Sequence, residues 1–382
     1  MAKLLLFNPS NDMALAANVR RYLPPRRVQQ MEADLAEFPR VWAEEDDAIL
    51  CTSSVFIGVA SQDCAAKPNC YELVPLPMGW SLATKTRFAQ AGIVDAHLPS
   101  EEQLALWRTL SSRRFATSYI HQLILLSDES ISRCFVGEKM HFYEQLDDVL
   151  FPAVFKSPWS SSGRGVFVAK QYDEATRKRL EGYLSSQGGF LSDSFYADKK
   201  LDFAFEYELK SDGTVAFVGY SVFEAGIDGN YGGNYVASQD DLRRMILSAL
   251  VPDIPVSVLD ELRDLHSHLL RQTLGDKYTG YVGIDMMVVK DAGRVKIHPC
   301  VEINLRMNMG IIAIRLFEKL ERFQRLEQET QRLRFRDFFF PFAALDDLNN
   351  CMRSSTRLPL TPNREHGFQA LMESCKLIIT FS

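Results

Sequence analysis

The chain has 382 residues, 46% of them hydrophobic, and a formal net charge of −6 at pH 7. This length and balance predict a globular protein of two or three domains, because a single core rarely grows beyond about 250–300 residues. The acidic net charge argues against a nucleic-acid surface, and no stretch reaches the ~18 apolar residues of a membrane span. Neither nucleic acid nor a membrane is therefore expected as a partner.

The seven cysteines are scattered and include no CxxC pair. A disulfide framework and a zinc site are therefore not expected. Because the apolar run near the N-terminus is also too short for a signal peptide, we expect a reduced, cytoplasmic protein.

The N-terminal part alternates short apolar strands with helical segments. Apolar runs at 3–7, 48–52 and 71–76 are typical of buried strands, and a helical stretch at 28–37 separates the first two. This alternation predicts a small Rossmann-like sheet.

The rest of the chain predicts paired strands between long helices. Apolar spacing from 100 to 126 indicates helix with one break, which we interpret as helix packing. Strand pairs are expected at 151–156 with 165–169, 202–209 with 214–223, and 281–289 with 296–304. Helices are expected at 173–186, 257–274 and 311–335. The last ~45 residues predict a polar loop and a final strand or two.

One motif, FPAVFKSPWSSSGRGVFV, places Lys156 at the end of an apolar strand, before a loop of small residues. Glycines let backbone N–H groups approach phosphate oxygens, serines add hydroxyl donors, and lysine adds a positive charge. The chain returns as a strand, so this is not a Walker loop, which leads into a helix. The motif predicts a triphosphate site, with a purely structural hairpin loop as the alternative.

A second polar group lies on the strand pair at 281–306. Asp285 stands in the first strand, and Glu302, Asn304 and Arg306 alternate along its partner. Alternate residues of a strand share a face, so Asp285, Glu302 and Asn304 can project together as oxygen ligands for Mg²⁺. The alternative is an exposed polar face on an edge strand.

Together, the segments AVFKSPWSSSGRGV, YVGIDMMVV and VEINLRMNMG resemble the ATP-grasp superfamily. The resemblance implies a multidomain chain of α/β and α+β class, with an ATP-grasp fold after a small Rossmann-like pre-ATP-grasp domain. The implied boundaries are 1–130 for the N-terminal domain, 131–210 and 211–335 for the two ATP-grasp subdomains, and 336–382 for a C-terminal extension.

The resemblance also implies roles on the phosphate side. Lys156 matches a lysine that contacts the α- and β-phosphates and supports catalysis, and Lys139 matches an earlier phosphate-binding lysine. The loop between the strands is expected to close over the triphosphate. Its candidate contacts are Ser160, Ser161, Ser162, Gly163, Arg164 and Gly165.

On the acidic side, Asp285, Glu302 and Asn304 match the family's Mg²⁺ ligands. Arg306 lies where the family places a charge that stabilises the acyl phosphate, so it is the second candidate catalytic residue.

The family's hinge strand, which holds adenine and ribose, matches FLSDSFYADKKLDFAFEYE. Asp193 stands where the family more often has Glu, and Asp202 is the second candidate contact of the nucleoside. The alternating aromatic residues Phe203, Phe205 and Tyr207 are expected in the core.

Two polar segments have open interpretations. The glycine cluster at 226–233 is either a lid over the substrate or a solvent loop. Asn8, Asn11 and Asp12 follow the first strand and either contact the non-nucleotide substrate or form a capped turn.

The resemblance implies an ATP-dependent ligase that activates a carboxylate as an acyl phosphate and joins it to an amine. MgATP and small-molecule substrates, amino acids or peptides first, are the expected ligands. A nucleotide-binding protein without turnover and a small-molecule kinase are the alternatives. The family frequently forms dimers, so a homodimer is also expected, although no motif marks an interface.

Overall fold

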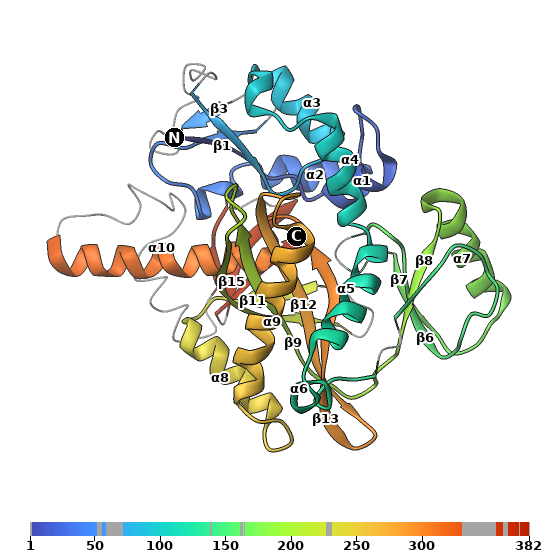
Figure 1. Ribbon diagram of the computed structural model, residues 1–382. Helices are drawn as coiled ribbons and strands as arrows, with labels where there is room; N and C mark the ends of the chain where they lie inside the picture. Colours follow the sequence, from blue (N-terminus) through green and yellow to red (C-terminus); the bar gives the residue numbers. More distant parts are fainter. Residues whose placement is uncertain are drawn as a thin grey trace. The chain divides into compact units, whose positions relative to one another are not determined.

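The computed structural model describes residues 2–51, 56–58, 72–137, 140–160, 163, 165–226, 231–330, 357–361, 366–373 and 375–381. The chain forms two compact units of mixed α/β structure (Figure 1). Unit 1 comprises Met1–Leu104, Gly233–Ser238 and Ile311–Ser382, and unit 2 comprises Ala105–Gly232 and Gln239–Gly310. In the described part of the chain, no helix combines the length and the apolar character that a membrane crossing requires.

The N-terminal sheet of unit 1 has the strand order β3-β2-β1-β4. Its strands are β1 (Lys3–Leu6), β2 (Ala48–Leu50), β3 (Phe56–Gly58) and β4 (Val74–Pro77). As the alternation predicts, β1 pairs in parallel with β2 and β4, whereas β3 is antiparallel to β2. The helical segments are α1 (Asn11–Ala17), α2 (Arg26–Asp34), η1 (Phe38–Val41), α3 (Leu82–Ala91), η2 (Asp95–His97) and α4 (Glu101–Leu110), in which the division between the units falls.

The other elements of unit 1 come from distant parts of the sequence. They are β14 (Arg357–Pro359), β15 (Phe368–Glu373), β16 (Lys376–Phe381), the end of β11 (Tyr231–Tyr235) and nearly all of α10 (Met309–Thr330). The strands β14, β15 and β16 are antiparallel neighbours, and β16 also pairs with β11. The predicted helix at 311–335 agrees with α10 as far as Thr330, and residues 331–335 lie outside the described residues.

Unit 2 is built on long antiparallel strands in the order β13-β12-β9-β10. They are β9 (Lys199–Leu209), β10 (Val215–Ala225), β12 (Gly280–Asp291) and β13 (Arg294–Asn304). Phe203, Phe205 and Tyr207 are fully buried, which confirms their predicted place in the core. Helices α5 (Arg113–Leu126), α8 (Gln239–Leu250) and α9 (Ser257–Leu274) contact this sheet or one another (Figure 1), and α6 (Glu129–Ser132) contacts α9.

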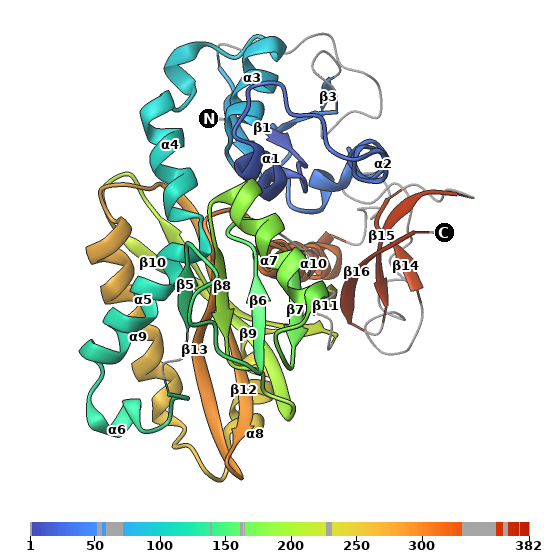
Figure 2. The same ribbon diagram turned by 90° about the vertical axis from the view of Figure 1, so that its right-hand side faces the viewer.

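A second sheet of unit 2 has the order β5-β8-β6-β7, with all neighbours antiparallel. Its strands are β5 (His141–Tyr143), β6 (Ala153–Lys156), β7 (Val166–Ala169) and β8 (Phe190–Asp193). The helix α7 (Glu174–Gln187) lies along it (Figure 2). Leu180 of this helix joins Phe155 and Phe190 in a small core. The predicted strand, loop and returning strand around Lys156 are therefore present as β6 and β7.

Candidate functional site

Three predicted metal ligands lie together on β12 and β13 of unit 2. Asp285 is the cross-strand partner of Glu302, and Gly283 is the partner of Asn304. Cross-strand partners share a face, so these side chains project on the same side of the sheet. Asn304 Nδ2 also donates a hydrogen bond to Asp285 Oδ2, at 3.0 Å. The pattern of the sequence thus corresponds to a real group of oxygen atoms.

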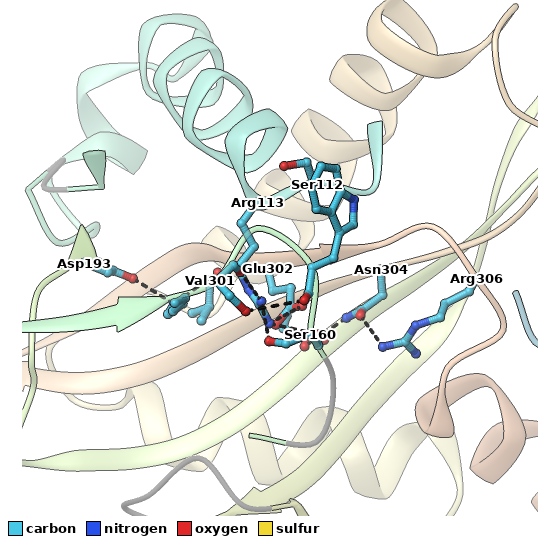
Figure 3. Close-up of polar contacts among 12 residues, drawn as sticks. Ser112, Arg113, Ser160, Asp193, Val301, Glu302, Asn304 and Arg306 are labelled. Atoms are coloured by element: carbon cyan, nitrogen blue, oxygen red, sulfur yellow. Dashed lines mark hydrogen bonds and ion pairs between the residues drawn. The ribbon is translucent and has the colours of Figure 1, made fainter. Parts of the chain in front are cut away.

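Arg306 extends this group beyond the end of β13. Its Nη2 donates to Asn304 Oδ1 at 2.8 Å (Figure 3). Burial and the neighbouring Glu302 carboxylate raise the pKa of Asp285 to about 7, against the opposing effects of Arg306 and Asn304. Two facing carboxylates with an arginine at their edge form a site of concentrated charge.

The donor set fits Mg²⁺ that arrives with phosphate groups. Asp285 and Glu302 offer carboxylates and Asn304 an amide oxygen, and Mg²⁺ usually takes one or two protein carboxylates and completes its shell with water and phosphate oxygens. Within the part of the chain that the structure describes, no group of three or more His, Cys, Asp or Glu side chains is placed to hold a metal ion unaided.

Glu206 on β9 belongs to the same polar face, although sequence analysis did not select it. It pairs with Gly283, is almost fully buried, and accepts hydrogen bonds from Asn308 Nδ2 at 3.1 and 3.0 Å. Burial, followed by repulsion from Asp285, raises its pKa well above the ordinary value. A Cβ on Gly310 would lie 2.1 Å from Glu206 Oε1, so a larger residue there would have to displace this buried carboxylate. The alternation of polar residues with the aromatic ones along β9 is the signal that could have identified Glu206.

The two ends of the loop after Lys156 lie close together. Ser157 N donates to Gly165 O at 2.8 Å, and a Cβ on Gly165 would lie 2.4 Å from Ser157 Oγ. Gly163 and Gly165 have left-handed φ angles of 73° and 71°. The backbone here therefore needs glycine for both its conformation and its packing. The other predicted contacts Lys139, Ser161, Ser162 and Arg164 lie outside the described residues.

Lys156 points from β6 toward β8 and β13. Its Nζ lies 3.2 Å from Asp193 Oδ2 and 3.4 Å from the Val301 carbonyl oxygen. His298 Nε2 lies 3.2 Å from the other carboxylate oxygen of Asp193. Burial by itself would raise the pKa of Asp193, but His298 and Lys156 lower it below the ordinary value. The predicted phosphate lysine and the first predicted hinge residue thus form one buried ion pair.

Asp202, the second predicted hinge residue, lies on β9 opposite Met287. Its carboxylate is 2.5 Å from Lys199 Nζ. Burial raises the pKa of Asp202, and the Lys199 partner opposes this. Met287 in turn pairs with His298 on β13. Asp202, Met287 and His298 are therefore cross-strand neighbours in one row, and Asp193 contacts this row through His298.

Arg113, the first residue of α5, joins the loop to the acidic face. Its guanidinium donates to Ser160 Oγ at 2.7 Å and to Glu302 Oε1 at 2.8 Å (Figure 3). Helix α4 and helix α5, which begins at Arg113, agree with the helical segment predicted from 100 to 126 and with its break. No local pattern marks this arginine, because its partner Glu302 is 189 positions away.

A scan against protein-family models finds no match, and a search of curated proteins finds none either. Solved structures similar to the chain include the L-amino acid ligase from Bacillus licheniformis, at 14% identity and a TM-score of 0.37. That match covers 63% of this chain and 50% of the ligase, so the chain spans half of the ligase's length.

A second similar structure is biotin carboxylase from Campylobacter jejuni, solved as a beta-gamma-ATP complex. The identity is 13% and the TM-score 0.44, over 83% of this chain and 70% of that one. A third, from Archaeoglobus fulgidus, is attributed to the ATP-grasp superfamily, with 11% identity and a TM-score of 0.40 over 84% of this chain and 88% of that one. All three TM-scores are below 0.5, so these likenesses do not assign a function to the chain.

Proposed function

We propose that the chain binds MgATP and uses it to join a carboxylate to an amine. The observation that carries this proposal is the meeting, inside unit 2, of the lysine and glycine loop with the face of Asp285, Glu302 and Asn304. Arg113 donates hydrogen bonds to both the loop and Glu302, and Lys156 Nζ donates one to the carbonyl oxygen of Val301, the residue before Glu302. A phosphate-binding loop and a cation site that lie this close favour a phosphorylated ligand that spans both.

On the nucleotide side, the glycine loop would present backbone N–H groups to phosphate oxygens, and Lys156 would supply positive charge. We propose that Asp193 and Asp202 contact the nucleoside. Asp202 is the cross-strand neighbour of Met287, and Asp193 contacts His298, the other neighbour of Met287, so the two carboxylates belong to one part of the site. Ser160, Gly163 and Gly165 are proposed loop contacts. Lys139, Ser161, Ser162 and Arg164 stay predictions from the sequence.

On the acidic side, Asp285, Glu302 and Asn304 would hold Mg²⁺, which when bound neutralises phosphate charge. Arg306 is oriented by Asn304 and can stabilise negative charge on a transferred phosphoryl group. These groups act by position and charge, so no protein nucleophile is needed.

The proposed reaction has two steps. A carboxylate oxygen of the substrate attacks the γ-phosphorus, the bond to ADP breaks, and an acyl phosphate forms. The amine nitrogen then attacks the acyl carbon, inorganic phosphate leaves, and the amine loses a proton as the amide forms. Lys156 and Arg306 would hold the phosphate groups in both steps. Amino acids and peptides are the substrates to test first. A cytoplasmic location and a homodimer stay predictions.

Product analysis tests the proposal. The protein is incubated with MgATP and mixtures of amino acids, and ADP, inorganic phosphate and new amides are measured by mass spectrometry. The matched variants are Glu302→Gln in the site and Glu174→Gln, which removes an exposed charge on α7. ADP, phosphate and an amide in the wild type and Glu174→Gln, but not in Glu302→Gln, support a ligase. ADP with a stable phosphorylated compound would instead identify a kinase, and nucleotide binding without ADP formation a binding protein.

A further inference from the structure

Arg113 is attached to the loop through its backbone as well as its side chain. Its backbone N–H donates to the Pro158 carbonyl at 3.0 Å, directly after the capping residue Ser112. The residue is only 5% exposed. The start of α5 and the start of the loop are therefore held together.

The guanidinium then divides its hydrogen bonds between two parts of the site. Nη1 donates to Ser157 O at 2.6 Å and to Ser160 Oγ at 2.7 Å. Nη2 donates to Ser160 O at 3.1 Å and to Glu302 Oε1 at 2.8 Å (Figure 3). The planar fork of arginine makes such a bridge, whereas the single ammonium of lysine does not.

A separate anchor holds the same loop without touching Glu302. Trp159 N donates to Gln187 Oε1 at 2.9 Å, and Trp159 Nε1 donates to the Arg108 carbonyl at 3.0 Å. Loosening the loop at Gln187 can therefore be compared with loosening it at Arg113.

We propose that Arg113 is a positioning residue that couples cation binding at Glu302 to the position of the loop at 157–160. The proposal rests on the proposed function, because it takes Glu302 as a cation ligand. A guanidinium and a metal cation are like charges that compete for the same carboxylate. Arg113 thus holds the loop in place but opposes the cation, and a bound cation weakens the link between Glu302 and the loop.

This competition predicts effects of opposite sign in Arg113→Ala. Mn²⁺, used alone as an electron paramagnetic resonance probe, should bind about tenfold more tightly, and a non-hydrolysable ATP analogue without metal about tenfold more weakly. Gln187→Ala should weaken only the nucleotide. Arg114→Ala, which removes an exposed arginine paired with Glu144, should change neither constant. Parallel changes in both constants, or no change in either, would overturn the coupling.

Hydrogen exchange tests the positioning role without any ligand. In Arg113→Ala the amides of Ser157 and Trp159 should exchange about tenfold faster than in wild type, and in Arg114→Ala at the wild-type rate. Arg113→Lys, which keeps the charge but loses the fork, should exchange like Arg113→Ala and serves if the alanine variant does not fold. Unchanged exchange in both Arg113 variants would overturn the proposal. If the Arg113 variants exchange faster but the wild-type protein binds neither Mn²⁺ nor nucleotide, the role of Arg113 as a loop anchor would stand. The proposed function, and the coupling built on it, would then be refuted.

Discussion

Two buried lysines, one in each unit, differ in the partners that their charged groups meet. Lys156 in unit 2 faces the Asp193 carboxylate, and Lys319 in unit 1 donates to the carbonyls of Arg40 and Ala43 at 2.8 and 2.7 Å. Burial lowers the pKa of Lys319 to about 7. In unit 2, burial acts to raise the pKa of Asp193, but His298 and then Lys156 lower it. The buried charge of Lys156 therefore meets a carboxylate, whereas that of Lys319 meets backbone carbonyl oxygens.

The largest expected effect comes from breaking the ion pair. Asp193→Asn leaves Lys156 without its carboxylate and should cost roughly 3–5 kcal/mol of unfolding free energy near neutral pH, measured by urea denaturation. Because folding lowers the pKa of Asp193, its contribution is present above the unfolded value of about 3.9 and is lost as pH falls below it. The difference from wild type should therefore shrink in acid. Asp198→Asn, at an exposed ion pair with Lys200, is the control and should leave the unfolding free energy nearly unchanged. Equal stability of Asp193→Asn and wild type at neutral pH would refute this prediction.

The next effect separates the two lysines by function. Lys156→Ala should raise the dissociation constant of an ATP analogue about 10- to 100-fold, because a charged hydrogen bond to phosphate is lost. Lys319→Met removes the other buried lysine and should leave that constant unchanged. Similar losses of affinity in both variants would show that the contrast between the lysines is wrong.

A third effect concerns the loop beside Lys156. Gly165→Ala forces alanine into a left-handed conformation and against Ser157 Oγ, which should destabilise the loop by about 1–2 kcal/mol and weaken nucleotide binding accordingly. Gly182→Ala is the matched change on α7, where an added Cβ meets nothing within 4 Å. It should raise helix stability by roughly 0.5–1 kcal/mol and leave the affinity as it is. Calorimetry and thermal unfolding measure both, and normal nucleotide binding by Gly165→Ala would count against the loop.

The last effect is gradual in pH and concerns the pH dependence that Lys319 confers. Folding lowers its pKa to about 7, so between that value and the unfolded value of about 10.4 the unfolded state holds one more proton. Wild-type stability should therefore rise with pH relative to Lys319→Met across this window, by at most about 1.4 kcal/mol per pH unit. The melting temperatures of both proteins over the window test this. Parallel pH curves would mean that Lys319 folds without a change in its pKa.

Much of unit 2 follows from local pattern. Alternation along β12 and β13 predicted that Asp285, Glu302 and Asn304 share a face, because a strand fixes side-chain direction residue by residue. The strands and the loop around Lys156 could be predicted equally well, because glycine and small polar residues interrupt two apolar runs. The helix at 257–274 was predicted with its observed bounds.

The missing parts depend on contacts between distant segments. Arg113 looked like one charge in a helical stretch, and only the fold brings it to Glu302. Glu206 lies on a predicted strand, yet its burial depends on Gly310 and Asn308 far along the chain. Sequence analysis also gave no indication that Lys156 and Asp193 form a buried pair with His298, because the partners lie on three different strands.

The most direct test of the central claim is calorimetric titration with a non-hydrolysable ATP analogue, with and without Mg²⁺, of wild type, Glu302→Gln and the control Glu174→Gln. We predict that Mg²⁺ strengthens binding in wild type and Glu174→Gln, and that Glu302→Gln loses most of this gain because a ligand charge is removed. Absence of binding in wild type, or an equal Mg²⁺ effect in all three proteins, would contradict the assignment of the site.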